Sequence, residues 1–282
     1  MTKQTADVQI DWNAILVEAI NAPGSLGKTY CRFYNYSFLN QIRLLMQGVN
    51  EPVATYNRWA ELGFQVRKGT KAKVVLAPKM ISKVVERNGQ PVIENGKPKK
   101  RQILIGFKEI RTVFGFSDTD GDELPPIELP AWQIDRALAG LGVERERFAH
   151  TDGNCQGYSY EKDGRKIIAI NPAAAYPGKT LLHELAHLVL GHCKARQEGE
   201  AEHRGVTEFE AEATAYLVAK ELEMPEGMWD PAESRAYIQG YLGSHPEGDA
   251  VVTDKHIGRI FGAVQKVLTA GRAAAEAAES AA

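Results

Sequence analysis

Three residues with clear chemical potential lie in one apolar segment of helical periodicity, KTLLHELAHLVLGHC at 179–193: His183, Glu184 and His187. An α-helix turns by about 100° per residue, so histidines four positions apart lie about 40° apart and both imidazoles can bind one cation. Glu184 follows His183 directly, where a general base can take a proton from a water that the cation acidifies. The pattern is the HExxH signature. We therefore predict that His183 and His187 bind Zn²⁺ and that Glu184 is the catalytic base.

A catalytic zinc site needs a third protein ligand and leaves its fourth position to water. His192 is a poor candidate because it follows His187 by five residues, about 140° around the same helix, and is expected to point away. The alternative interpretation of the motif is that its histidines only have ordinary core partners. The helical context favours the metal site, so the third ligand is expected from another segment.

A second helical segment, TEFEAEATAYLV at 207–218, carries Glu208 and Glu212 on one face. The arrangement resembles that of the gluzincins, whose second helix carries a ligand glutamate followed four residues later by an acid that orients a ligand histidine. The resemblance implies that Glu208 is the third ligand and Glu212 the orienting acid, and the reverse assignment stays open. Glu210, between them, is expected on a solvated helix face.

The composition is that of a soluble protein: 282 residues, 44% of them hydrophobic, with no apolar run long enough to span a membrane and no secretory leader. The three cysteines have no metal-binding spacing and are odd in number, so they are expected to be reduced thiols. We therefore expect a cytoplasmic protein without a membrane partner, of one large or two small domains.

Charge divides the chain into two parts. Residues 1–116 contain 18 Lys and Arg against 8 Asp and Glu, a net charge of +10, whereas residues 117–282 contain 16 against 28, a net charge of −12. A cationic surface is what polyanions bind. The junction at 117–130 is acidic and contains prolines, which predicts a domain boundary there. The predicted domains are 1–127 and 128–271, followed by an alanine-rich tail at 272–282.

The periodicity predicts an α+β protein. Helices are indicated at 11–21, 37–47, 132–141, 179–193, 207–218, 232–242 and 253–269. Alternating segments at 73–77, 81–85 and 102–107 predict an antiparallel sheet, and KPKKR at 97–101 indicates an exposed hairpin arm. A further strand at Lys166–Ile170 is expected to present an open edge, to which an extended peptide can add as another strand.

Cations in the basic part are candidates for nucleic-acid contacts. Aromatic residues mix with Arg32 and Arg43 around TYCRFYNYSF at 29–38, and such a mixture can stack unpaired bases and bind phosphates, although core packing is the ordinary role of any single aromatic. Further cations occupy solvent-side positions along the predicted sheet: Arg58, Arg67, Lys68, Lys71, Lys73 and Lys79. The alternative is a solvated charged face, but few acids intervene, which favours nucleic acid.

The order of the segments TYCRFYNYSFLNQIRLLMQ, ATYNRWAELGFQVRKGTKAKVVLAPK and TVFGFSDTDGDELP resembles the N-terminal domain of the ArdC-type antirestriction proteins of plasmids and phages. The resemblance continues through HELAH, EFEAEATAYL and RAYIQGYL to about residue 271, and the HExxH part is similar to the ImmA/IrrE metallopeptidases. It implies a domain that binds single-stranded DNA, a zincin-like domain, and a role for a mobile element that enters a restricting host. The segment 187–208 departs from the pattern, because it is short, polar and charged.

Three functions are compatible with these features. The first is an antirestriction protein that binds single-stranded DNA and has a zinc-dependent metallopeptidase domain of gluzincin type. The second is a DNA-occlusion factor whose zinc is not catalytic, and the third is an ImmA/IrrE-like regulatory protease that cleaves a repressor. No residue identifies a protein substrate. The spacing also does not choose a transition-state hydrogen-bond donor among Tyr158, Tyr160, Tyr216 and His203.

Overall fold

The computed structural model describes residues 10–31, 36–87, 90–121, 124, 131–149, 155–193, 204–225, 227–243 and 252–272. The chain divides into two compact units. Unit 1 comprises Met1–Ile10 and Gln47–Glu123, and unit 2 comprises Asp11–Met46 and Leu124–Ala282. Helices and antiparallel strands are both abundant, which confirms the predicted α+β class. The division differs from a single boundary at residue 127, since residues 11–46 belong with the C-terminal part.

Unit 1 is a small antiparallel sheet with one short helix. Its main elements are β1 (Val53–Thr55), α4 (Tyr56–Glu61), β2 (Gln65–Val66), β3 (Lys73–Val84), β8 (Lys100–Gly115), the 3-10 turn η1 (Phe116–Asp118) and β9 (Thr119–Asp120). The sheet order is β1-β8-β3, and β2 pairs with β9. Trp59 of α4 is fully buried against Phe64 and Phe116, and its indole N–H donates to the Phe114 carbonyl at 3.0 Å. This aromatic cluster packs beside the buried aliphatic side chains of the sheet, among them Val53, Val75 and Val113.

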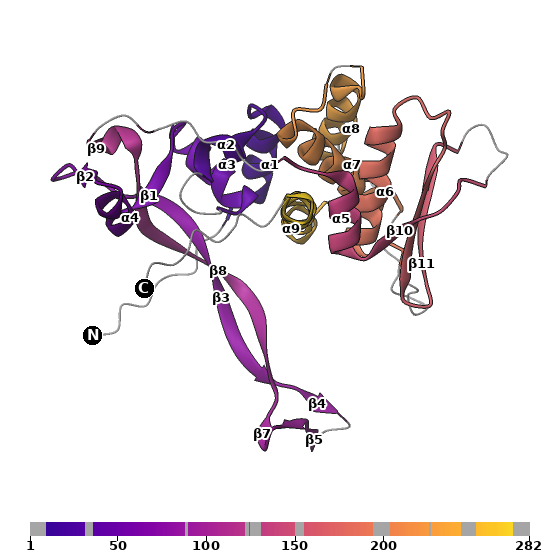
Figure 1. Ribbon diagram of the computed structural model, residues 1–282, viewed down its shortest axis with the longest axis horizontal. Helices are drawn as coiled ribbons and strands as arrows, with labels where there is room; N and C mark the ends of the chain where they lie inside the picture. Colours follow the sequence, from indigo (N-terminus) through magenta and orange to yellow (C-terminus); the bar gives the residue numbers. More distant parts are fainter. Residues whose placement is uncertain are drawn as a thin grey trace. The chain divides into compact units, whose positions relative to one another are not determined.

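The outer part of β3 and β8 forms a two-stranded arm (Figure 1). The two strands pair from Lys73↔Val113 to Val84↔Lys100, whereas β1 pairs with β8 only at 113–115. Two small ladders follow beyond the arm: β4 (Glu86–Arg87) with β5 (Gln90–Pro91), and β6 (Ile93–Glu94) with β7 (Lys97–Pro98). The predicted antiparallel strands and exposed hairpin are confirmed, with the separate segments at 73–77 and 81–85 joined into one strand.

The sheet of unit 2 has three strands, in the order β10 (Val143–Arg145), β12 (Arg165–Ile170) and β11 (Gly157–Lys162). β12 is parallel to β10 and antiparallel to β11. The expectation of an open edge at Lys166–Ile170 was wrong, because the short strand β10 pairs with the other side of β12. Within the described part of the chain, β11 and β10 are the edge strands.

The helix α7 (Arg204–Glu221) is the centre of unit 2, with 13 of its 18 residues buried. It packs against α6 (Pro177–Leu190), α8 (Pro231–Gly243) and α9 (Asp254–Gly271), and α9 also packs against α5 (Ile134–Leu141). Carboxylates buried on such a helix need partners, since an unpaired buried charge is costly.

None of the helices in the described ranges is long and apolar enough to cross a membrane.

The N-terminal helices α1 (Trp12–Asn21), α2 (Leu26–Tyr30) and α3 (Phe38–Met46) belong to unit 2 because they pack on its core. Asp11 caps α1 by accepting a hydrogen bond from the Ala14 N–H at 2.9 Å. Glu221, at the end of α7, accepts the backbone N–H groups of Leu26 at 2.7 Å and Gly27 at 2.9 Å. This buried carboxylate fixes α2 to the helix that forms the centre of the unit.

Candidate metal centre

The helix α6 positions the two histidines of the HExxH motif. It begins with Pro177 in its first turn and ends at Gly191, whose φ of 79° is a left-handed cap that glycine adopts without strain. Leu182, Leu185, Ala186 and Leu188 bury one side of the helix in the core. This leaves His183 and His187 on a half-buried side that faces α7.

Three side chains converge at this face: His183, His187 and Glu208. The Nε2 atoms of the histidines are 3.1 Å apart, and Oε2 of Glu208 lies 3.3 Å from Nε2 of His183 and 3.5 Å from Nε2 of His187. Ligand atoms bound at about 2.05 Å in a tetrahedral zinc site are themselves about 3.3 Å apart. Two imidazoles and one carboxylate at this separation therefore fit a small divalent metal ion.

Glu212 lies behind His183 on the side away from Glu208. Its Oε2 is 3.0 Å from Nδ1 of His183 and 2.6 Å from Nζ of Lys179. Burial opposes ionisation of this carboxyl, but the hydrogen bond to His183 and the charge of Lys179 outweigh it and lower the pKa of Glu212 to about 2. Spacing alone left open which glutamate is the ligand. The structure brings Glu208 to both Nε2 atoms and Glu212 to Nδ1 of one ring.

The imidazoles and the carboxylates of the cluster shift each other's pKa values. Hydrogen bonds from His183 and His187 hold the pKa of Glu208 well below its usual range. Burial lowers the pKa of His183, but the hydrogen bonds to Glu208 and Glu212 outweigh burial and raise it to about 9. Both carboxylates are therefore ionised at neutral pH, and a metal ion that binds between the rings has to displace the proton that His183 holds in its absence.

Glu184 is held by a residue that the sequence analysis missed. Ser159 of β11 donates its hydroxyl to Oε2 of Glu184 at 2.7 Å, and Cys193 Sγ lies 3.6 Å from the same hydroxyl. In β11, side chains alternate between two faces, and Ser159 is on the face opposite to Tyr158 and Tyr160. In the sequence, the one indication of this role was a small polar residue between two tyrosines in the strand β11, which precedes β12 and the HExxH helix.

His192 and Glu210 do not lie where the helical pattern predicted. His192 is beside His187, with their Nδ1 atoms 2.9 Å apart, because Gly191 ends α6 and the chain no longer follows the helix. Glu210 is fully buried rather than solvated, and its Oε2 is 2.8 Å from Nε2 of His192. The expectation for Glu210 was wrong, because His192 and Arg259 of α9 cover this position of α7. His192 is not among the three converging side chains, as expected.

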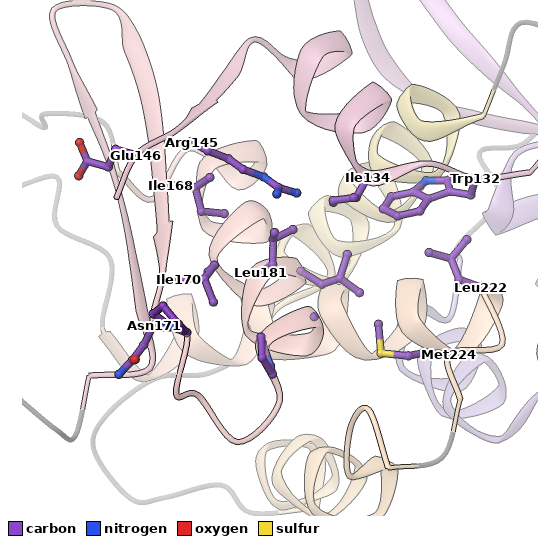
Figure 2. A pocket seen from close by; sticks show the side chains of 14 residues that line it. Trp132, Ile134, Arg145, Glu146, Ile168, Ile170, Asn171, Leu181, Leu222 and Met224 are labelled. Carbon is purple, nitrogen blue, oxygen red and sulfur yellow. The ribbon is translucent and has the colours of Figure 1, made fainter. Parts of the chain in front are cut away.

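A separate cavity of about 500 Å³ lies beside α6 (Figure 2). Its lining is largely apolar and includes Trp132, Ile168 and Leu181. Figure 2 shows Arg145 reaching toward Ile134, and Arg145 also pairs with Asp135 at 3.2 Å. None of the three converging metal-site residues lines this cavity, so the cavity and the metal centre are distinct features of unit 2.

The predicted DNA-contact residues are divided between several places. Arg32 lies outside the described residues, and Arg43 is on α3 in unit 2. Three of the predicted cations in unit 1 pair with acids: Arg58 with Glu61 at 2.9 Å, Arg67 with Asp120 at 3.2 Å, and Lys73 with Asp118 at 3.5 Å. Arg67 also donates to the carbonyls of Ser117 and Thr119, which ties β2 to β9. Lys68 and Lys71 are exposed.

A cationic face of the arm was not recognised from sequence. On one face of the ribbon, Lys83 pairs with Arg101, Lys79 pairs with Gly106, and Lys108 pairs with Ala77. Lys83, Arg101 and Lys108 are exposed. Residues that pair across strands share a face, and alternation along β3 puts Ala77, Lys79 and Lys83 on the same face. The three exposed cations Lys83, Arg101 and Lys108 therefore form one stripe, which passes the register shift between Lys79 and Met80 and which we call the arm stripe.

Comparison with known proteins gives two matches along the sequence, and the first of them includes residues 11–46, which belong to unit 2. Residues 3–114 match the family model of the N-terminal domain of anti-restriction factor ArdC, and residues 138–242 match the IrrE N-terminal-like domain of the M78 peptidases. The chain therefore combines an N-terminal domain of the ArdC type with a zincin-like domain. The M78 match and the converging histidines and glutamate together support a divalent metal at this centre.

Two solved structures resemble the chain over 93% of its length and 96% of theirs. They are the metal-free structure of the antirestriction ArdC protein from the R388 plasmid, at 20% identity and a TM-score of 0.44, and its Mn(II)-bound structure, at 19% identity and 0.46. A comparison with curated protein sequences gives no match.

Proposed function

We propose that this ArdC-type protein serves a mobile element by binding single-stranded DNA through unit 1 and by hydrolysing peptide bonds at a zinc centre in unit 2. The observation that carries the proposal is the convergence of His183, His187 and Glu208 at ligand spacing, with Glu184 next to His183 on the same helix. Two imidazoles, one carboxylate and a neighbouring acid are the donor set of zinc hydrolases.

In the proposed hydrolysis, each residue of the site has a separate role. Zn²⁺, when bound by His183, His187 and Glu208, supplies Lewis acidity that lowers the pKa of water and polarises a carbonyl. Glu184 receives the proton, and the Ser159 hydroxyl orients its carboxylate by donating to Oε2. The same strand, β11, has an unpaired edge among the described residues, and an extended peptide can add to such an edge.

The DNA-binding half of the proposal rests on the arm stripe of Lys83, Arg101 and Lys108. Cations that neutralise phosphates supply affinity without reading sequence. Ile81 lies on the same face and is 43% exposed. An apolar side chain among cations suits unpaired bases, whose faces are accessible, better than duplex bases, which remain stacked. Lys68 and Lys71 add exposed charge in the same unit.

The test compares wild type with His183→Ala and Glu184→Gln. Zinc content measured by mass spectrometry is expected near one equivalent for wild type and Glu184→Gln, and near zero for His183→Ala. Cleavage of fluorescein-labelled casein is expected for wild type alone, because Glu184→Gln keeps the ligands and loses the base. Equal cleavage by Glu184→Gln would refute the assigned base.

Binding of a labelled single-stranded oligonucleotide, measured on the same samples, separates the two halves. Affinity that is equal in all three proteins is expected, since the arm stripe lies in unit 1 and the ligands lie in unit 2. Antirestriction activity that survives His183→Ala would favour DNA occlusion with non-catalytic zinc.

The IrrE-like match favours one second candidate, a regulatory protease that cleaves a repressor. In that case the DNA affinity of the full chain is weak, and one defined partner is cleaved by wild type but not by Glu184→Gln. Strong, salt-dependent binding of single strands together with resistance of purified repressors to cleavage would exclude it.

A further inference from the structure

A chain of buried polar side chains extends from His187 away from the converging ligands. Nδ1 of His187 lies 2.9 Å from Nδ1 of His192, and Nε2 of His192 lies 2.8 Å from Oε2 of Glu210. The side chain of His192 is 4% exposed and that of Glu210 is 0% exposed. Polar groups buried to this extent are expensive unless every one of them has a defined partner.

The proton positions in this chain follow from the geometry. If Nε2 of His187 offers its lone pair to a metal, the ring proton of His187 is on Nδ1. That N–H donates to Nδ1 of His192, which must then be the unprotonated nitrogen of its ring. The proton of His192 is therefore on Nε2, where it donates to the carboxylate of Glu210. Each nitrogen has one role, and the order of donors fixes the tautomer of both rings.

Glu210 is anchored in turn by α9. Nη2 of Arg259 lies 3.4 Å from Oε2 of Glu210 and donates to the Leu190 carbonyl, at the end of α6, at 3.0 Å. Oε1 of Glu210 has no hydrogen-bond partner among the described residues. The carboxylate is thus directed through Oε2 at both His192 and Arg259, and the last turn of α6 is fixed to the same guanidinium.

We propose that His192 and Glu210 are positioning residues, which hold the ring of His187 in the orientation and tautomer that bind a metal. The two ligand histidines are then supported differently. His183 contacts the carboxylate of Glu212 directly at 3.0 Å, whereas His187 reaches the carboxylate of Glu210 through a second imidazole. The inference rests on the proposed metal site. Removal of such supporting groups typically weakens metal binding by about 10- to 100-fold.

The experiment measures zinc affinity of the full chain by competition with a chromophoric chelator, and the visible absorption spectrum of the Co²⁺-loaded protein. His192→Phe keeps a planar aromatic ring and removes both the acceptor and the donor nitrogen, so we expect zinc affinity to fall by about 10- to 100-fold and the Co²⁺ bands to shift. His192→Gln can accept from one neighbour and donate to the other, so it should restore much of the affinity. A purely structural role of His192 does not predict this rescue.

Glu221→Gln is the matched control for Glu210→Gln. Both glutamates are buried on α7 and lie within 3.4 Å of an arginine, but Glu221 contacts Arg272 and α2 rather than a histidine of the metal site. Both variants should unfold at lower urea concentration. Only Glu210→Gln should weaken zinc binding and shift the Co²⁺ spectrum.

The outcomes separate the two proposals. If wild type binds no zinc, the proposed metal site fails. If wild type binds zinc and His192→Phe and Glu210→Gln bind it with unchanged affinity and spectra, the metal site stands and the positioning role is refuted. If both variants fail to fold, the His192→Gln variant decides. Zinc affinity and a Co²⁺ spectrum like those of wild type in His192→Gln support the donor–acceptor chain. Normal folding of His192→Gln with weakened zinc binding overturns it.

Discussion

The arm stripe predicts a salt dependence whose size can be worked out from its residues. Lys83, Arg101 and Lys108 are exposed on one face of the ribbon. If each neutralises one phosphate of a single strand, log K against log[salt] has a slope of about −2 from these contacts. Raising salt from about 50 to about 200 mM should then weaken binding by roughly 20-fold through the arm alone.

The perturbation is the double substitution Lys83→Gln and Arg101→Gln, which removes a cross-strand pair of like charges. It should reduce the magnitude of the slope by about 1.4 and weaken binding at every salt concentration. The assay is fluorescence anisotropy of a labelled single-stranded oligonucleotide over a salt series. Folding should be unimpaired, since opposed like charges are destabilising and their removal relieves repulsion.

A matched control has the same loss of two charges elsewhere. Lys255 and Lys266 are exposed on α9 of unit 2, and Lys255→Gln with Lys266→Gln should leave the slope unchanged. An unchanged slope in the arm variant, or an equal reduction in the control, would refute the assignment of the arm as the DNA surface and point to net charge or to another face.

Three further predictions concern unit 2. Glu212→Gln should weaken zinc binding by about 10- to 100-fold, because the partner of His183 Nδ1 loses its charge, and chelator competition checks this; unchanged affinity would argue against an orienting role. Burial lowers the pKa of Lys220 from 10.5 to about 8 in the folded protein. Between pH 8 and pH 10.5 the unfolded chain therefore binds more protons at Lys220 than the folded chain does. The free energy of unfolding should rise with pH over this range. Urea titrations of wild type and Lys220→Met over pH 8 to 10.5 should show the rise only in wild type. Glu221→Ala should cost about 3 kcal/mol in the same assay, because it leaves Arg272 without its carboxylate and two N–H groups of α2 unpaired.

Local patterns predicted the parts of the site that lie within one element. The spacing of His183 and His187 predicted a helix with both rings on one face, and α6 has this form. The spacing of Glu208 and Glu212 predicted a shared face on a second helix, and α7 presents both to His183. Their roles as ligand and orienting acid stay predictions, as do Zn²⁺ and the action of Glu184.

Features that depend on a distant partner could not be predicted in this way. Glu210 was assigned to solvent because its partner Arg259 is on α9, and no local signal connects the two. The strand β12 was assigned an open edge because β10 is only three residues long and gives no alternating pattern. In each case the deciding contact joins segments far apart in sequence, where periodicity carries no information.

The placement of the N-terminal helices in unit 2 also depends on contacts between segments far apart in sequence, and it affects how unit 2 can be studied. Glu221 is buried at the end of α7, and its backbone partners Leu26 and Gly27 precede it by 195 and 194 positions. A fragment that begins at residue 128 would leave this carboxylate with Arg272 as its remaining partner in the described structure and would expose the apolar surfaces that α1 and α3 cover. A buried charge that loses partners is strongly destabilising.

The helix affected by such a truncation is the one that holds the candidate metal site. Glu208, Glu210, Glu212 and Glu221 all lie on α7, and each is paired with a different set of side chains or backbone groups. Loss of residues 11–46 would therefore remove helices that cover the core of unit 2 and destabilise the unit that contains the ligands, whereas a single substitution such as Glu221→Gln leaves these helices in the chain. A peptidase assay on the isolated C-terminal part would then test a damaged centre, so residues 11–46 have to be retained when the activity of unit 2 is measured alone.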